Sequence, residues 1–195
     1  MININFIFPE IFLSISIMFS LLFSVFKKNS AEYVYNICIF SLFVTIGLLL
    51  NNSFDEKNLL FDRSYKIDYL SNIVKVITLI TSSLVLITSI DYLKKSKILK
   101  SEYPILINSS ILGMLVMLSS NDLIVFYIGL ELQSLALYVL SSFKTNSLSS
   151  SEAGLKYFVL SALSSGLLLY GCSLVYGFTG TTNFDIISQN LDTAG

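Results

Sequence analysis

The chain has 195 residues, of which 54% are hydrophobic and 13% are charged, and its formal net charge is -1. A soluble domain carries about 25% charged residues, so this composition and a mean hydropathy of +0.75 exclude an ordinary soluble fold. The chain has no histidine, and its two cysteines, Cys38 and Cys172, lie far apart in apolar segments. No haem, zinc or iron–sulfur ligand set is therefore expected in this chain.

Six apolar segments approach the roughly 20 helical residues that cross a hydrocarbon core about 30 Å thick. They lie at residues 7–26, 33–50, 69–92, 104–120, 122–143 and 153–177. The first is expected to be a retained span and not a signal peptide, because Lys27 and Lys28 follow the apolar stretch instead of preceding it. We therefore predict an all-α fold, a polytopic membrane helix bundle that forms a single domain over residues 1–195.

Basic residues distinguish the two ends of the predicted bundle. The first, third and fifth loops carry seven lysines, whereas the second loop offsets three basic residues with four acidic ones and the fourth loop is uncharged. The seven are Lys27, Lys28, Lys94, Lys95, Lys97, Lys100 and Lys144. Because cytoplasmic loops are enriched in lysine and arginine, we predict that the odd loops face the cytoplasm or matrix, with both termini on the opposite side.

Glu131 is the most informative charge because it lies inside the apolar segment 122–143. It follows Asp122 by nine residues, which places it roughly 13 Å deep at 1.5 Å per residue. A carboxylate in hydrocarbon costs about 2.5 kcal/mol or more, so it needs a partner, a proton or water. Glu131 is therefore the first candidate for a functional residue.

Two further charges occur at the start of the last span. Glu152 precedes Lys156 by four residues, which is the favourable order for an ion pair on one helix face. The alternatives are a capping role for Glu152, which has capping-box spacing from Ser149 and would start the helix near Ser150, and snorkelling of Lys156 to the basic side. A buried acid and a buried lysine set each other's charge state, so Glu131 and Lys156 together are suited to load and release a proton.

Lys75 is a further charge within a span. It lies one and a half turns into the segment 69–92, and that segment supplies no carboxylate close to it. Snorkelling to the nearer end of the helix is one interpretation. We assign Lys75 a packing or water-pathway role.

Four stretches of the sequence resemble one known family. They are FPEI at 8–11, NDLIVFYIGLELQSL at 121–135, SEAGLKYFVL at 151–160 and YGFTGTTNF at 176–184. Together they resemble the antiporter-like subunit 2 of proton-pumping NADH:quinone oxidoreductase, respiratory complex I. The likeness runs along the whole chain and is strongest from about residue 102 to residue 185.

The resemblance implies an antiporter-like inverted-repeat fold, of which this chain would form the first part. It implies that Glu131 and Lys156 are the charged pair of a proton channel, with Glu152 as the candidate partner of Lys156. It also implies that the chain belongs to the H⁺-translocating NADH:ubiquinone reductase and works beside other membrane-arm subunits. FMN, the iron–sulfur clusters, NADH and ubiquinone would be handled elsewhere in the complex, so this chain is expected to bind no cofactor and to carry out no electron transfer.

The sequence departs from the family in its length. Members usually have a second, inverted half with further buried lysines, which these 195 residues lack. Inverted repeats build their midplane site from both halves, so we expect a truncated product or a split subunit whose second half is carried by a separate chain.

The sequence leaves alternatives open for the membrane in which the chain lies and for its class of function. The abundance of Ile, Asn, Ser and Lys without Trp, and the absence of a transit peptide, favour synthesis inside an organelle and hence the mitochondrial inner membrane; a bacterial inner membrane is the alternative. The alternative functions are a cation/proton antiporter or membrane hydrogenase subunit of the same fold, and a purely structural membrane subunit. The lipid bilayer is an expected partner, and nucleic acid is not.

Overall fold

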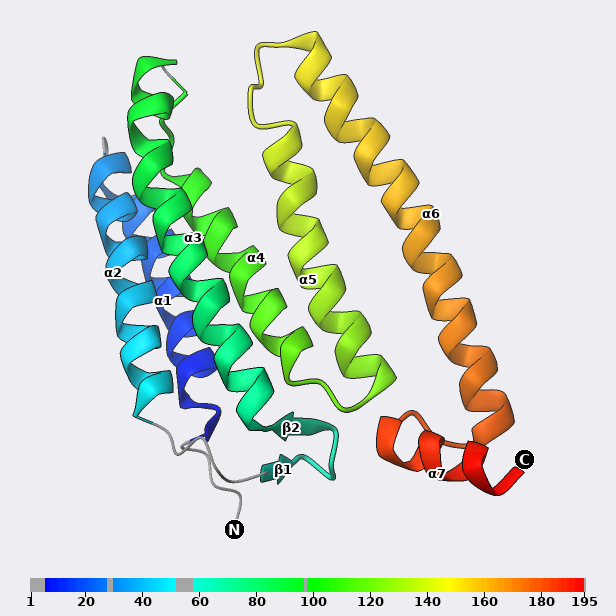
Figure 1. Cartoon of the computed structure of the whole chain (residues 1–195). Coiled ribbons are helices and arrows are strands. Elements are labelled where there is room, and N and C mark those ends of the chain that lie inside the picture. The colour runs from blue at the N-terminus through cyan, green and yellow to red at the C-terminus, as the bar shows by residue number, and fades with distance from the viewer. Residues whose placement is uncertain (1–5, 28–29, 52–57, 97, 195) are drawn as a thin grey trace.

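The computed structural model describes residues 6–27, 30–51, 58–96 and 98–194. The helices are α1 (Phe8–Phe26), α2 (Ala31–Leu50), α3 (Tyr69–Lys95), α4 (Glu102–Leu118), α5 (Leu123–Ser141), α6 (Leu148–Thr179) and α7 (Phe184–Ala194). Between α2 and α3, β1 (Asn58–Leu60) and β2 (Tyr65–Ile67) pair antiparallel, with Leu59 opposite Lys66. Figure 1 shows α1 to α6 running up and down, with α7 and the hairpin at the lower end.

The architecture confirms the predicted fold class, an all-α membrane helix bundle. In the described part of the chain, α1, α2, α3, α5 and α6 are long and apolar enough to cross a membrane, and α4 is a shorter apolar helix. Each of these helices overlaps one of the six predicted apolar segments. The hairpin and α7 were not predicted.

The start of α6 differs from the predicted start near Ser150. The N-cap residue is Ser147, whose hydroxyl accepts a hydrogen bond from the backbone N–H of Ser150 at 3.4 Å. Ser149 does not cap the helix, because its hydroxyl hydrogen-bonds with that of Ser147 at 2.8 Å. The helix therefore begins one turn before the apolar segment, and Glu152 is left to interact along the helix surface.

The core of the bundle lies among α1, α2, α3 and α4. Among the described residues, thirteen buried apolar side chains form one cluster there, including Leu13 of α1, Tyr35 and Cys38 of α2, and Leu86 of α3. The buried Asn108 of α4 donates through Nδ2 to the Cys38 carbonyl oxygen, at 3.3 Å. The core thus fixes the first four helices relative to one another.

Two glycines set the packing of α5 on α4. A Cβ added to Gly129 of α5 would lie 2.8 Å from the backbone nitrogen of Met117, and one added to Gly113 of α4 would lie 2.6 Å from that of Gln133. Backbones approach this closely only where side chains are absent, which is a common device of membrane helix pairs. The crossing therefore determines where the middle of α5, including Glu131, is held.

Helix α6 lies at the edge of the bundle, and its main packing partner among the described helices is α5 (Figure 1). Its described residues are nearly all exposed, and Gly154 is the one that is buried. The contact with α5 is aromatic: the ring of Tyr138 lies 5.0 Å from that of Tyr157 and 5.6 Å from that of Phe158, centroid to centroid. The remaining apolar surface of α6 suits lipid or another protein surface.

The hairpin is attached to the loops on either side of α5 and α6. Its turn holds three consecutive residues, Phe61, Asp62 and Arg63, in the left-handed region, with φ of 50°, 52° and 68°. The Arg63 carbonyl oxygen accepts from Nδ2 of Asn121 at 2.9 Å and from Nδ2 of Asn183 at 3.0 Å. Residues of the α4–α5 and α6–α7 loops therefore meet at one backbone oxygen.

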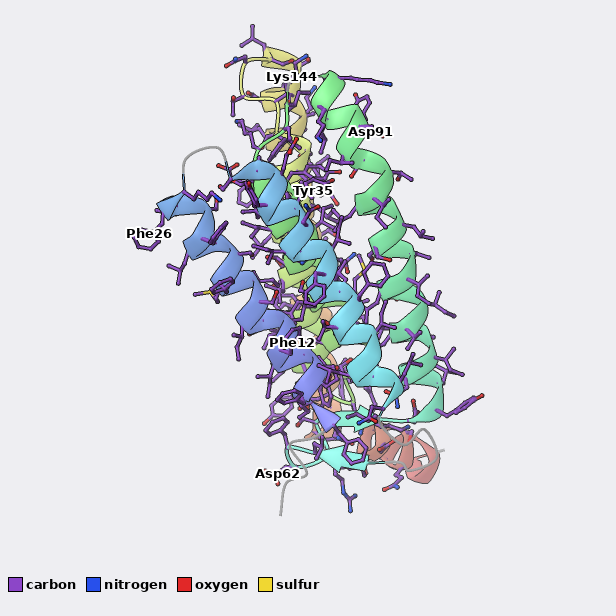
Figure 2. All side chains as sticks on the ribbon, turned by 90° about the vertical axis from the view of Figure 1, so that its left-hand side faces the viewer. Phe12, Phe26, Tyr35, Asp62, Asp91 and Lys144 are labelled. Atoms are coloured by element: carbon purple, nitrogen blue, oxygen red, sulfur yellow. The ribbon has the colours of Figure 1, made fainter. Side chains whose placement is uncertain are left out.

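The two ends of the bundle carry different loops. Asp91 and Lys144 mark one end in Figure 2, and Asp62, on the hairpin, marks the other. The predicted orientation counted Lys28, Asp55, Glu56, Lys57 and Lys97 as well, and these lie outside the described residues. We refer below to the end with Asp91 and Lys144 as the basic-loop end, and to the other as the hairpin end.

Candidate functional site

Glu131 lies on α5, two residues after the glycine that packs against α4. Its side chain is half-buried, and its Oε1 atom is buried without a hydrogen-bond partner among the described residues. A buried acceptor that lacks a donor costs about 1–3 kcal/mol. The described residues therefore supply no donor that offsets this cost at Glu131 Oε1.

Glu152 and Lys156 form an ion pair on α6. Lys156 Nζ lies 2.6 Å from Glu152 Oε1, and both side chains are exposed, with 68% and 63% of their surfaces accessible. This is the pair that the i,i+4 spacing indicates. An exposed pair of this kind contributes little to stability, so its charges remain available to water or to a neighbouring protein.

Glu131 and Lys156 lie at different heights along the bundle. Tyr138 follows Glu131 by seven residues, or two turns, on the same face of α5, and it packs on Tyr157, the neighbour of Lys156. At 1.5 Å per residue this separates the two levels by roughly 10 Å. The structure thus brings both residues to the α5–α6 pair, and no ion pair joins them in the part of the chain that it describes.

A third charged cluster was missed by sequence reasoning. Lys75 Nζ of α3 donates to Glu10 Oε1 of α1 at 2.5 Å, and the side chains retain only 1% and 6% of their exposure. The Tyr65 hydroxyl of β2 donates to the same oxygen at 2.9 Å and accepts from Lys75 Nζ at 3.3 Å. Side chains of β2 and α3, which are neighbours in sequence, therefore converge on a carboxylate of α1 that lies 55 and 65 residues earlier in the chain.

The sequence contained a usable signal for this pair. The prediction found no partner for Lys75 because it considered only carboxylates of the same helix, whereas Glu10 comes from α1. Both helices begin at the hairpin end, Glu10 is the third residue of α1 and Lys75 the seventh of α3. Two opposite charges at similar depths in parallel spans predict an ion pair between those spans, because a lone charge in hydrocarbon is costly.

Tyr65 completes the cluster from outside the membrane-spanning helices. Burial, and then the negative charge of Glu10, hold the pKa of the Tyr65 hydroxyl well above its ordinary value near 10. The phenol therefore remains protonated and donates to the carboxylate. Within the described ranges, no three or more His, Cys, Asp or Glu side chains gather where they could hold a metal ion.

Comparison with known proteins confirms the resemblance to complex I subunits. Residues 120–194 match the family described as NADH:quinone oxidoreductase/Mrp antiporter, TM. NADH-quinone oxidoreductase subunit N of Pelagibacter ubique is 60% identical over 192 residues, which are 98% of this chain and 41% of that protein. Subunit N of Rhodobacter capsulatus is 45% identical, over 91% of this chain and 37% of that protein. The chain thus spans about two-fifths of the length of these curated relatives.

Solved structures share the fold. A chain of respiratory complex I from Thermus thermophilus with bound Aureothin superposes with a TM-score of 0.75 at 23% identity, over 90% of this chain and 38% of that one. A chain of the membrane-bound sulfane sulfur reductase, an archaeal respiratory membrane complex, gives a TM-score of 0.70 at 17% identity, over 93% and 39%. The same helix arrangement therefore occurs in two kinds of respiratory membrane complex.

Proposed function

We propose that this chain, a close homologue of NADH-quinone oxidoreductase subunit N, is part of a proton-translocating subunit in the membrane arm of respiratory complex I. The identity of 60% to a curated subunit N supports this over a free-standing cation/proton antiporter or a hydrogenase subunit. NADH oxidation, with FMN and iron–sulfur clusters, and quinone reduction would take place in other subunits. This chain would move protons and no electrons.

The observation that carries the proposal is the buried Oε1 of Glu131, which has no hydrogen-bond partner among the described residues. A buried acid has two accessible states, a neutral one that suits hydrocarbon and a charged one that needs water or a cation nearby. The glycine crossing of α4 and α5 holds it in place, so a change in hydration or in a neighbouring charge changes its protonation without moving the helix. This is the property that a proton-translocating group requires.

The Glu152–Lys156 pair is proposed to load Glu131. The pair lies roughly 10 Å from Glu131 along the bundle, toward the basic-loop end, a distance that a few ordered water molecules bridge. When Lys156 is held by Glu152 its charge is far from Glu131, and when it is released its charge favours the ionised state of that acid. Glu152 is thus a positioning residue for Lys156.

We propose that the proton channel is completed by protein outside this chain. The exposed surface of α6, on which Lys156 lies, is the natural contact for the second half of the subunit and for other membrane-arm subunits. The described relatives are bacterial, which supports the bacterial inner membrane as the location over the mitochondrial one. Isolation of the membrane complex tests the assignment: this chain should co-purify with flavin and iron–sulfur proteins.

Substitution of Glu131 tests the proton-handling role. Glu131→Gln keeps the shape and removes the titratable group, so proton translocation and coupled NADH:quinone turnover should fall roughly tenfold or more, with Glu131→Asp recovering part of the loss. Lys156→Ala should act similarly, and Lys156→Arg should restore less than full activity because arginine does not readily release its proton.

The control is Glu102→Gln, which removes an exposed acid at the start of α4 and should leave turnover unchanged. Proton uptake and NADH oxidation are measured in membrane vesicles, and the amount of assembled complex is determined in parallel. A fully assembled Glu131→Gln complex with an unchanged proton-to-electron ratio and unchanged turnover would make Glu131 a structural residue.

A further inference from the structure

We propose that Glu10, Lys75 and Tyr65 form a second proton-exchange site, which opens toward the hairpin end of the bundle. The inference rests on the proposed function and adds residues of α1, α3 and β2 to it. The ligand of this site is a proton, delivered through water. Its chemistry is the transfer of that proton between the lysine and the carboxylate.

The burial of the pair is the first argument for a chemical role. Both side chains are almost completely removed from solvent, at 1% for Lys75 and 6% for Glu10. Desolvation of two charges offsets most of their attraction, and apolar side chains of similar volume usually stabilise a fold at least as well. Stability alone therefore does not account for this pair inside a helix bundle whose neighbouring core is apolar.

The asymmetry of the Glu10 carboxylate is the second argument. Its Oε1 atom accepts from both Lys75 Nζ, at 2.5 Å, and the Tyr65 hydroxyl, at 2.9 Å. Its Oε2 atom is buried and has no partner in the described part of the chain. One oxygen is saturated with donors while the other is free, so Oε2 is where a proton or a water molecule binds.

Proton transfer within the pair is balanced and removes both charges. One proton passes from the Lys75 ammonium to the Glu10 carboxylate, which leaves a neutral amine and a neutral carboxylic acid. Low polarity favours this neutral form and water favours the ion pair, so the state of the pair follows its hydration. Tyr65 hydrogen-bonds to both partners and holds them within reach in either state.

The location connects the pair to one side of the membrane. Glu10 is in the first turn of α1, and Lys75 is the seventh residue of α3, roughly 10 Å from the start of that helix. The hairpin lies at this end (Figure 1), and its Tyr65 reaches the pair from there. The Glu152–Lys156 pair lies on the other side of Glu131, toward the basic-loop end, so the two lysines serve opposite ends of the bundle.

A neutral double variant separates a proton-handling role from a structural one. Glu10→Gln combined with Lys75→Met removes both charges, leaves no unpaired ion and keeps an acceptor for Tyr65. The complex should assemble, and proton translocation in membrane vesicles should fall roughly tenfold. An assembled double variant with an unchanged proton-to-electron ratio and unchanged turnover would overturn the proposal.

The matched control removes the same charges from an exposed pair. Lys94 and Glu32 lie 2.8 Å apart with 44% and 62% of their side chains exposed, and Glu32→Gln with Lys94→Met should leave proton translocation unchanged. Glu131→Gln is measured in the same vesicles. If it lowers translocation and the Glu10/Lys75 variant does not, the proposed function stands and this inference fails. If Glu131→Gln has no effect, the proposed function fails.

Two milder variants decide the question should the double variant not assemble. Lys75→Arg keeps the positive charge but does not readily release a proton, and Tyr65→Phe removes a single hydroxyl. Both should assemble and show reduced proton translocation if the cluster exchanges protons. Normal translocation by these assembled complexes would make the cluster a structural link between α1, α3 and the hairpin, and would overturn the proposal.

Discussion

Gly129 lets α5 pack closely on α4, and this contact positions the nearby Glu131. It places the backbone of α5 against Met117 of α4, where an added Cβ would lie 2.8 Å from a backbone nitrogen. Glu131 follows two residues later, so this contact determines the position of its Cα along the bundle and the direction of its side chain. Backbone packing therefore positions the carboxyl group, whose buried Oε1 has no hydrogen-bond partner among the described residues.

Substitution of Gly129 by alanine should separate α4 from α5. Overpacking of a tight contact costs about 1–3 kcal/mol, so Gly129→Ala should lower the thermal stability of the complex and its proton translocation together. Gly47→Ala on α2 is the matched control, since a Cβ there has no neighbour within 4 Å. Equal melting temperatures for the two variants would show that the α4–α5 contact tolerates a methyl group.

At the scale of elements, α7 and the hairpin are tied together by Asn183. Its Oδ1 accepts from the backbone N–H of Asp185 at 3.1 Å at the start of α7, and its Nδ2 donates to the Arg63 carbonyl oxygen at 3.0 Å. Asn121 donates to the same oxygen and also to Asp185 Oδ2, at 2.9 Å each. The Asn183 side chain thus caps α7, and both asparagine side chains connect α7 with the hairpin.

Asn183→Ala should loosen α7 and the hairpin at once. Loss of a helix cap costs about 0.5–2 kcal/mol, and the Arg63 carbonyl loses one of its two donors. Hydrogen exchange, measured by mass spectrometry on the purified complex, should accelerate in the peptides that cover α7 and in those that cover the hairpin. Asn36→Ala, at an exposed position of α2, is the control and should change neither. Acceleration in α7 alone would mean that Asn121 suffices to hold the hairpin.

At the scale of the whole molecule, the orientation in the membrane is still a prediction from the distribution of lysines. It is tested with single cysteines in a background from which Cys38 and Cys172 have been removed. Thr145→Cys, in the α5–α6 loop, should react with a membrane-impermeant maleimide only from the cytoplasmic side. Asp62→Cys, on the hairpin, should react only from the opposite side. The reverse pattern of labelling would invert the assignment of both ends.

The fold class was predictable because hydropathy is a property of consecutive residues. An apolar run of about 20 residues has few alternatives to a membrane helix, since the bilayer offers its backbone no other hydrogen-bond partners. The hairpin was missed because its strands have three residues each, too few for a periodic pattern. Helix α7 follows the last apolar segment and has a mixed composition, so it also escaped the hydropathy criterion.

The candidate site was predictable only in part. Glu131 and Lys156 are visible as charges within apolar runs, and the Glu152–Lys156 pair follows from helix periodicity. The partner of Lys75 lies 65 residues away on another helix, and local spacing carries no information about such a contact. The free Oε2 of Glu10 depends on the direction of a single carboxyl group, which is determined by packing in three dimensions.

The left-handed turn of the hairpin connects two loops at the hairpin end of the bundle with the buried Glu10. Three consecutive residues, Phe61 to Arg63, hold a conformation that costs about 1–2 kcal/mol per residue, and asparagines from two different loops hold the turn there. The next strand carries Tyr65 to Glu10. A displacement of the loop after α6 would shift Asn183 and the Arg63 carbonyl oxygen to which it donates, and with them the strand that holds the Tyr65 hydroxyl. Hydrogen bonds through the hairpin thus connect the α6–α7 loop, at the edge of the molecule, with the buried Glu10–Lys75 pair.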